Sequence, residues 1–289
     1  VGTYKDHIYR TRCLLRKEKK YAKEMLSYSI PLIFSGLAWW INSVSDRYIV
    51  SWIMGVAATG VYSVAYKIPT MLQLVQDIFG PAWNLSVFDV YDKEEGDRYI
   101  NNIYDFYNFI MVFACSVLIF MDKPLARFLF SNEFYEAWRY VPVLLMSVVF
   151  IGMGACAGPI LNAYKKSGLA ARGSIYSACT NVVLNIILIK WIGVQGAAIA
   201  TLISYFVSWI YQVIQAKKLC GFFFDWKKHG FMYVMLLIET LVVLYCSQFW
   251  VSIVFVVLIM AINIENCRKL MDKLKYTRLE LIHKITGKE

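Results

Sequence analysis

The chain has 289 residues, of which 59% are hydrophobic and 17% charged, and its formal net charge is +10. A soluble globular domain has about 45–50% apolar and about 25% charged residues, so this composition argues against one. Of the 30 Lys and Arg residues, 24 fall in five windows separated by long apolar stretches, 1–25, 89–105, 165–172, 217–228 and 265–289. Because these basic residues lie beside apolar segments, we expect anionic membrane lipids, and no nucleic acid, as their partners.

The N-terminal segment 1–25 is charged and has no leading apolar region, which argues against a signal peptide. The chain begins with Val1 rather than Met. We expect these residues to form a basic cytoplasmic connector that follows an upstream segment, so that the chain would be a fragment of a longer protein.

A helix that crosses a membrane needs about 20 mostly apolar residues. The sequence predicts an all-α polytopic membrane protein with about eight such helices, at about 26–53, 59–88, 106–128, 140–163, 173–191 and 195–216 and as a short pair within 230–264. The expected turns on the outer side are Gly55–Gly60, a loop at Phe130–Arg139 that could hold a short interfacial helix, Gly193–Gly196 and Ser247–Ser252. Every basic window then falls on one side, and the positive-inside rule places that side and both termini in the cytoplasm.

The sequence offers no pattern typical of catalysis or of a bound cofactor. The seven cysteines are scattered without C-x-x-C spacing, the three histidines lie in or next to basic windows, and there is no P-loop motif. The glycine-rich run 152–158 lies inside an expected span, where it indicates close helix packing, with a kink at Pro159. We therefore expect no enzyme activity, no metal and no cofactor.

Five ionisable residues lie inside the expected spans, namely Asp46, Arg47, Lys67, Asp77 and Glu239. A charge at mid-bilayer costs about 2.5–3.5 kcal/mol on insertion scales, so such residues face a cavity or a partner. Arg47 and Lys67 could line a cationic cavity for an anionic substrate, and Asp46 or Asp77 could bind a coupling cation. Asp46 and Arg47 are adjacent and point about 100° apart on a helix, so they do not form a simple pair. The alternative is that these residues lie near the interfaces, where they only snorkel or pair; Asp77 and Glu239 are the weaker candidates.

Uncharged polar residues also fall in the expected spans, among them Gln73, Asn181 and Asn185. Asn181 and Asn185 are four residues apart and share one helix face. These side chains either form hydrogen bonds between helices, worth about 1 kcal/mol or less each, or line a polar lumen.

Two blocks of sequence resemble a known family. Residues Pro159–Tyr205 read PILNAYKKSGLAARGSIYSACTNVVLNIILIKWIGVQGAAIATLISY, and Gly60–Pro69 read GVYSVAYKIP after Asp46-Arg47-Tyr48-Ile49. Their Leu-Asn-Ala helix end, basic loop, Asn-x-x-x-Asn helix and Gly-x-x-Gly-Ala-Ala-x-Ala-Thr helix start resemble the multidrug/oligosaccharidyl-lipid/polysaccharide exporter superfamily. The block from Asp46 to Pro69 looks like its polysaccharide transporter branch, which includes O-antigen and capsule repeat-unit flippases.

This resemblance implies a fold of two six-helix lobes that face a central cavity. Segment 26–216 would be the C-terminal lobe, 217–264 a basic loop with an additional helix pair, and 265–289 a basic cytoplasmic tail. The whole protein would flip an undecaprenyl-pyrophosphate-linked oligosaccharide across the bacterial cytoplasmic membrane, with Arg47 and Lys67 contacting its anionic head group. The implied partners are a missing N-terminal lobe and polysaccharide polymerase or glycosyltransferases.

Three alternatives remain open at the level of sequence. A cation-coupled drug antiporter of the same superfamily would need an acidic, aromatic cavity and would depend on a carboxylate. A membrane enzyme of envelope assembly would need a large outer loop or an intramembrane His, and neither is found here. A single lobe could also act as a non-transporting scaffold of a polysaccharide assembly complex.

Overall fold

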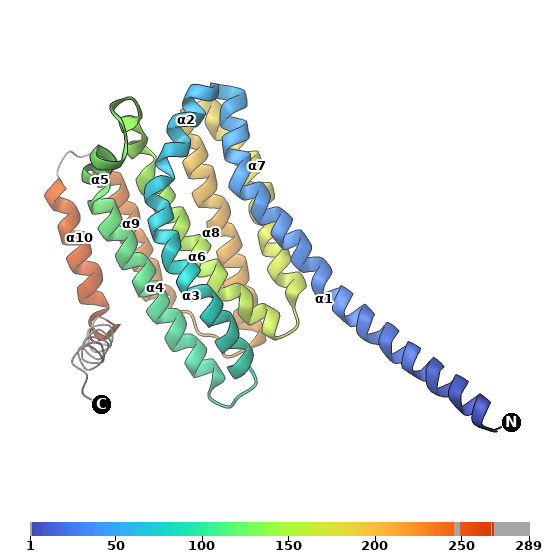
Figure 1. Cartoon of the computed structure of the whole chain (residues 1–289). Coiled ribbons are helices and arrows are strands. Elements are labelled where there is room, and N and C mark those ends of the chain that lie inside the picture. The colour runs from blue at the N-terminus through green and yellow to red at the C-terminus, as the bar shows by residue number, and fades with distance from the viewer. Residues whose placement is uncertain (1, 246–248, 267, 269–289) are drawn as a thin grey trace, which may run out of the picture.

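The computed structural model describes residues 2–245, 249–266 and 268, and every regular element within those ranges is a helix (Figure 1). The elements are α1 (Gly2–Met54), α2 (Val56–Ala65), α3 (Lys67–Val90), α4 (Gly96–Phe120), α5 (Asp122–Leu129), the 3₁₀-helix η1 (Asn132–Arg139), α6 (Val141–Ala163), α7 (Ser167–Ile192), α8 (Val194–Leu219), α9 (Trp226–Tyr245) and α10 (Phe249–Ile262). By length and composition, five of them are apolar and long enough to cross a membrane: α4, α6, α7, α8 and α9. The chain is thus an all-helical polytopic membrane protein, as the sequence predicts.

The N-terminal part of the bundle differs from the sequence-based expectation. Helix α1 continues without interruption through the expected connector 1–25 into the first expected span. The second expected span, 59–88, is two helices that meet at Tyr66. Pro69 explains this break, because it has no N–H to donate to the carbonyl of Ala65, where α2 ends. Lys67 is therefore the exposed first residue of α3.

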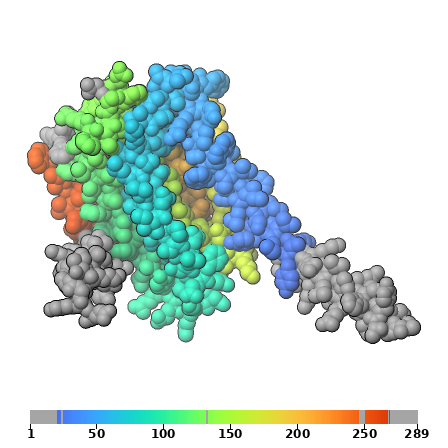
Figure 2. Space-filling model, viewed as in Figure 1, coloured from blue at the N-terminus to red at the C-terminus, as the bar shows by residue number. Residues whose placement is uncertain are grey.

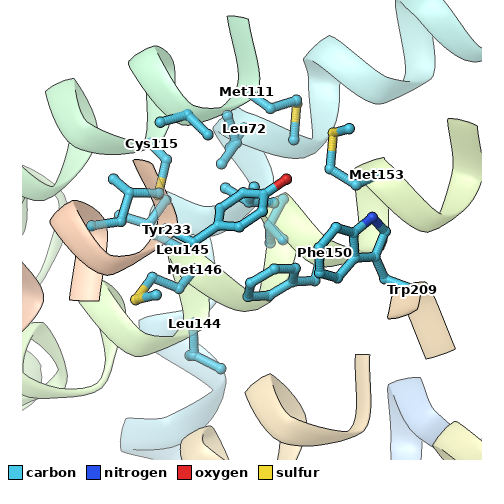
Figure 3. Packing of buried hydrophobic residues seen from close by; sticks show 14 of the residues in the cluster. Leu72, Met111, Cys115, Leu144, Leu145, Met146, Phe150, Met153, Trp209 and Tyr233 are labelled. Atoms are coloured by element: carbon cyan, nitrogen blue, oxygen red, sulfur yellow. The ribbon is translucent and has the colours of Figure 1, made fainter. Parts of the chain in front are cut away.

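The centre of the bundle is α6, whose first ten residues are all buried. Figure 3 shows its apolar side chains meeting residues of four other helices. These neighbours are Leu72 of α3, Met111 and Cys115 of α4, Trp209 of α8 and Tyr233 of α9. A Cβ on Gly152 would lie 2.8–2.9 Å from the side-chain tips of Met111, Gln76 and Tyr107, so a larger residue would displace these tips. The glycine-rich run therefore permits close helix packing.

Helices α1 and α7 run side by side in the same direction and are joined by polar side chains. Their partners are 135–139 residues apart in sequence throughout, as expected for two parallel helices in register. We call this set the α1/α7 polar seam; its hydrogen bonds join Ser35 to Ser174 (2.8 Å), Asn42 to Ser177 (3.0 Å), Ser45 to Asn181 (2.6 Å) and Asp46 to Asn185 (2.7 Å). The polar residues of this seam lower the apolar character of α1, which is why it is not among the five apolar helices.

A second polar seam joins α4 to α9. The imidazole Nε2 of His229 lies 3.0 Å from Asp105 Oδ1, and the Tyr233 hydroxyl donates to Asn108 Oδ1 at 2.6 Å. Further along, the Ser116 hydroxyl donates to Glu239 Oε2 at 2.7 Å. Glu239 is completely buried and its Oε1 has no hydrogen-bond partner. This seam holds the C-terminal helices against the remainder of the bundle.

The basic windows between helices gather at one end of the bundle. The connections α3–α4, α6–α7 and α8–α9 all lie at the lower end in Figure 1, where α1 also begins. In the last of these connections, the backbone N–H groups of Lys228 and Lys227 donate to Asp225 and lower the pKa of its carboxyl. The opposite end carries α5, η1 and the α7–α8 connection. Most of the expected tail 265–289, and part of the expected turn at Ser247–Ser252, lie outside the described residues.

Candidate functional site: a polar cavity beside a buried carboxylate

A cavity of about 730 Å³ lies between α1, α3, α6, α7 and α8. Figure 2 shows α1 and α3 standing apart on one face, with α8 visible deeper between them. The lining is rich in amides and hydroxyls, which include Asn42, Ser43, Thr70, Gln73, Gln76, Ser147, Asn162, Ser174, Ser177, Thr201, Ser208 and Gln212. Helix α6 contributes Gly154 and Gly158, whose lack of a side chain leaves room beside Gln212.

The wall of this cavity carries two charged side chains among the described residues. They are Arg47 on α1 and Asp77 on α3, so the wall has no net charge. The sequence suggested a cationic cavity lined by Arg47 and Lys67, but Lys67 is not among the lining residues. Gln73, a further predicted candidate, does line the cavity.

Arg47 is exposed, and its guanidinium stands over an aromatic ring. The guanidinium carbon Cζ is 5.2 Å from the centroid of the Tyr66 ring, a cation–π distance. Tyr66 also lines the cavity. The planar, permanently charged guanidinium is suited to binding carboxylate or phosphate groups.

Asp46, the neighbour of Arg47, is fully buried beneath this wall. Its Oδ1 accepts a hydrogen bond from Asn185 Nδ2 at 2.7 Å. Its Oδ2 accepts from the hydroxyls of Thr201, Tyr66 (3.1 Å) and Tyr62 (3.2 Å). The carboxylate therefore gathers donors from α2, the α2–α3 junction, α7 and α8. Such charge-assisted hydrogen bonds stabilise its ionised form.

The two asparagines of α7 face Asp46 and not the cavity. The prediction that Asn181 and Asn185 share one face is confirmed, since Asn185 Nδ2 also lies 3.0 Å from Asn181 Oδ1. Ser45 donates to the same Asn181 oxygen at 2.6 Å. Neither asparagine is a lining residue, so their observed contacts are those of interhelical hydrogen bonding.

Oxygen atoms suited to a hard cation surround Asp46. They belong to the Asp46 carboxylate, the side-chain amides of Asn181 and Asn185, and the Thr201 hydroxyl. The Asn185 amide oxygen is buried and has no hydrogen-bond partner. Hard cations prefer carboxylate, carbonyl and hydroxyl oxygens. No group of three or more His, Cys, Asp or Glu side chains comes together in the described part of the chain.

Three members of the Asp46 environment were not singled out from the sequence: Thr201, Tyr62 and Tyr66. The two tyrosines are four residues apart, a spacing that places both on one helix face. Thr201 lies 155 residues from Asp46 and bonds it only because α8 returns beside α1. No local pattern could have revealed this pairing.

The fold is similar to that of solved transporters. One is the lipid II flippase MurJ in an inward closed conformation, with a TM-score of 0.62, 19% sequence identity and coverage of 87% of this chain and 56% of that chain. Another is a MOP superfamily transporter from Pyrococcus furiosus, with a TM-score of 0.57, 20% identity and coverage of 77% of this chain and 52% of that one. At these identities the likeness shows the fold alone.

A family model matches part of the sequence. Residues 7–138 match a family described as polysaccharide biosynthesis protein. The match covers 132 of the 289 residues and runs from α1 into η1. It agrees with the resemblance found in the sequence.

A curated relative of this chain is archaeal. It is the probable low-salt glycan biosynthesis flippase Agl15 of Haloferax volcanii, 24% identical over 223 residues, which are 76% of this chain and 47% of that protein. The chain thus spans about half the length of the relatives it matches. The sequence suggested a bacterial cytoplasmic membrane. The chain is a multi-pass membrane protein, and its relatives include archaeal proteins.

Proposed function

We propose that the chain is one lobe of a flippase that moves polyprenyl-pyrophosphate-linked oligosaccharides across the cytoplasmic membrane for surface glycan assembly. The observation that carries this proposal is the cavity with its amide- and hydroxyl-rich wall and one exposed arginine, in a chain whose residues 7–138 match a polysaccharide biosynthesis family. The flippase assignment of the archaeal relative supports the same substrate class.

The chemistry of the wall matches the two polar parts of such a substrate. Sugar hydroxyls need hydrogen-bond partners in place of water, and the amides and hydroxyls of the wall supply both donors and acceptors. Arg47 would pair with the pyrophosphate through its forked N–H groups. The polyprenyl chain needs no such wall, because it is as apolar as the surrounding lipid.

The proposal also includes the orientation of the bundle in the membrane and the presence of a second lobe. The basic connections gathered at one end support a topology of eight spans with that end in the cytoplasm, in contact with anionic lipids. The length of the relatives supports a second lobe facing the cavity. A polymerase or glycosyltransferases would supply or consume the lipid-linked glycan.

Asp46 is the best-placed residue to couple flipping to an ion. A cation or a proton on this buried carboxylate would change the charge of the lobe next to the cavity. One elementary charge that crosses 100 mV supplies about 2.3 kcal/mol. Asp77, which lies in the cavity wall itself, is the second candidate.

Asp77 also favours one competing function. A cation-coupled drug antiporter of the same superfamily would use a cavity carboxylate, and Asp77 is in the cavity whereas Lys67 is not. Loss of drug export in Asp77→Asn, together with unchanged glycan flipping in Arg47→Ala, would favour the antiporter.

The decisive test uses the complete gene product that contains this chain, reconstituted in proteoliposomes with a fluorescent polyprenyl-pyrophosphate oligosaccharide. We expect the protein to speed access of the labelled glycan to an external quencher. Arg47→Ala should reduce this rate, whereas Gly230→Ala, a change in open space on α9, should not. A rate equal to that of protein-free liposomes would refute the flippase proposal and favour a scaffold.

A further inference from the structure

One side chain contacts both halves of the candidate site. The ring of Tyr66 lies under the Arg47 guanidinium, with 5.2 Å between Cζ and the ring centroid. The hydroxyl of the same residue donates to Asp46 Oδ2 at 3.1 Å. Tyr66 therefore connects an anion-binding group in the cavity wall to a buried carboxylate behind it.

A second tyrosine has one of these contacts and lacks the other. The Tyr62 hydroxyl lies 3.2 Å from Asp46 Oδ2 and 3.3 Å from the Tyr66 hydroxyl. The two rings meet edge to face, with centroids 5.3 Å apart. Tyr62 is completely buried and does not line the cavity. It thus provides a matched control that binds Asp46 without holding Arg47.

The place of Tyr66 in the fold suits a side chain that responds to its surroundings. It occupies the junction between α2 and α3, where the missing N–H of Pro69 interrupts the helical hydrogen bonding. Residues at the ends of elements absorb the small rotations that accompany switching. A change at the Tyr66 hydroxyl can therefore move its ring without breaking a continuous helix.

We propose that Tyr66 is a positioning residue that couples cation occupancy at Asp46 to the availability of Arg47 for an anionic head group. Without a cation, Asp46 accepts the Tyr66 hydroxyl and the ring holds the guanidinium in place. A monovalent cation at Asp46 competes for the same oxygen and releases the ring, so that Arg47 is free to pair with phosphate. The inference rests on the proposed function, and thermodynamic linkage requires the head group to strengthen cation binding by the same factor.

Other charged and titratable groups near Tyr66 could also respond to a cation at Asp46. Tyr62 and Tyr205 flank Asp46, while Arg47 and Asp77 belong to the cavity wall. The electrostatic influence of Asp46 on an anion at Arg47 does not pass through the Tyr66 hydroxyl. A variant that lacks only this hydroxyl therefore isolates the mechanical link.

The test measures the affinity of farnesyl pyrophosphate for the complete gene product in lipid nanodiscs. Titrations in sodium chloride and in choline chloride at pH 7.5 report the cation effect. In the wild type, we expect cation to tighten binding by about fivefold or more, the lower end of allosteric couplings. Tyr66→Phe, which keeps the ring, should reduce this ratio to about one, the value for uncoupled sites. Tyr62→Phe should leave the ratio as in the wild type.

Each outcome bears on a different part of the argument. A wild-type cation effect that is lost in Tyr66→Phe and kept in Tyr62→Phe supports the link. Retention of the full effect in Tyr66→Phe, or its loss in both variants, overturns the role of Tyr66 alone. Binding without any cation effect overturns the coupling and leaves the flippase standing, whereas absence of binding overturns both. Arg47→Lys gives an independent check, since it keeps the charge, loses the planar stacking and should also lose the cation effect.

Discussion

Asp46 and Arg47 are adjacent in sequence and lie on opposite sides of the cavity wall. Asp46 is fully buried and accepts hydrogen bonds from four side chains, while Arg47 is exposed and lines the cavity. A helix turns by about 100° per residue, so one step along α1 is enough to separate the two charges. The pair therefore serves two sites and not one.

Removing the charge of Asp46 should separate its structural role from its functional role. Asp46→Asn keeps the size of the side chain and one acceptor, so we expect a folded protein whose flipping rate no longer depends on sodium or pH. Asp46→Ala leaves the donors of Asn185 and Thr201 without an acceptor, at about 1–3 kcal/mol each. The thermal unfolding temperature in detergent should therefore fall clearly for Asp46→Ala and less for Asp46→Asn. Equal ion dependence in Asn and wild type would contradict the coupling role.

Substitutions of Arg47 and of Lys67 should differ in their effect on head-group binding. Arg47→Ala removes a charged hydrogen-bond donor worth about 1.5–3 kcal/mol, which corresponds to about 10- to 150-fold weaker binding of farnesyl pyrophosphate. Lys67→Ala should leave affinity unchanged, because Lys67 does not line the cavity. The original sequence hypothesis expects both variants to weaken binding. An effect of Lys67→Ala as large as that of Arg47→Ala would restore it.

The Ser116–Glu239 contact offers a double-mutant cycle in the α4/α9 seam. Ser116→Ala removes the hydrogen bond to Glu239 Oε2 and leaves that buried oxygen unpaired, at about 1–3 kcal/mol. Replacing both partners, in Ser116→Ala with Glu239→Leu, should recover most of this loss. Glu239→Gln should unfold close to the wild-type temperature, since the amide oxygen can still accept from Ser116. A double variant less stable than Ser116→Ala alone would show that Glu239 has a further partner.

Gly196 should not tolerate a side chain. A Cβ there would lie within 2.8 Å of backbone atoms of Leu188 and Ile189 in α7, and such overpacking costs about 1–3 kcal/mol. Gly230→Ala is the matched control, because its Cβ meets nothing within 4 Å and Ala favours helix by about 1 kcal/mol. Unfolding temperatures should therefore move in opposite directions for the two variants. A stable Gly196→Ala would mean that α8 can move away from α7.

Single-cysteine labelling checks the orientation of the bundle. In a background without the seven native cysteines, Lys166→Cys lies in the α6–α7 connection and Ser131→Cys between α5 and η1. An impermeant maleimide should label Ser131→Cys in intact cells and Lys166→Cys only after permeabilisation. The reverse pattern would place the basic end outside, against the positive-inside rule.

The helices in the middle of the chain could be predicted closely from the sequence. Expected spans 140–163 and 195–216 correspond to α6 (Val141–Ala163) and α8 (Val194–Leu219), because uninterrupted apolar runs end there at glycine or lysine. The break at Tyr66 could not be read from hydropathy, since Pro69 acts on a carbonyl four residues earlier. Hydropathy therefore did not indicate that a new helix begins at Lys67.

The candidate site was only partly accessible to sequence reasoning. The unusual polarity of Asp46, Arg47, Asp77 and Gln73 within apolar segments identified them as candidates. Which of them face the cavity depends on contacts with α7 and α8, more than 130 residues away. Hydrogen-bond donors such as Thr201 are ordinary residues in their own helix and acquire a role only through that distant pairing.

The α1/α7 polar seam also has a consequence for biosynthesis. A ribosome completes α1 long before α7, because bonded partners in the seam are at least 135 residues apart. During that interval the serines, Asn42 and Asp46 of α1 have none of their α7 partners. The insertion machinery must therefore retain α1 in a hydrated or shielded place until α7 arrives. Nascent chains stalled before α7 should remain at the translocon and be degraded.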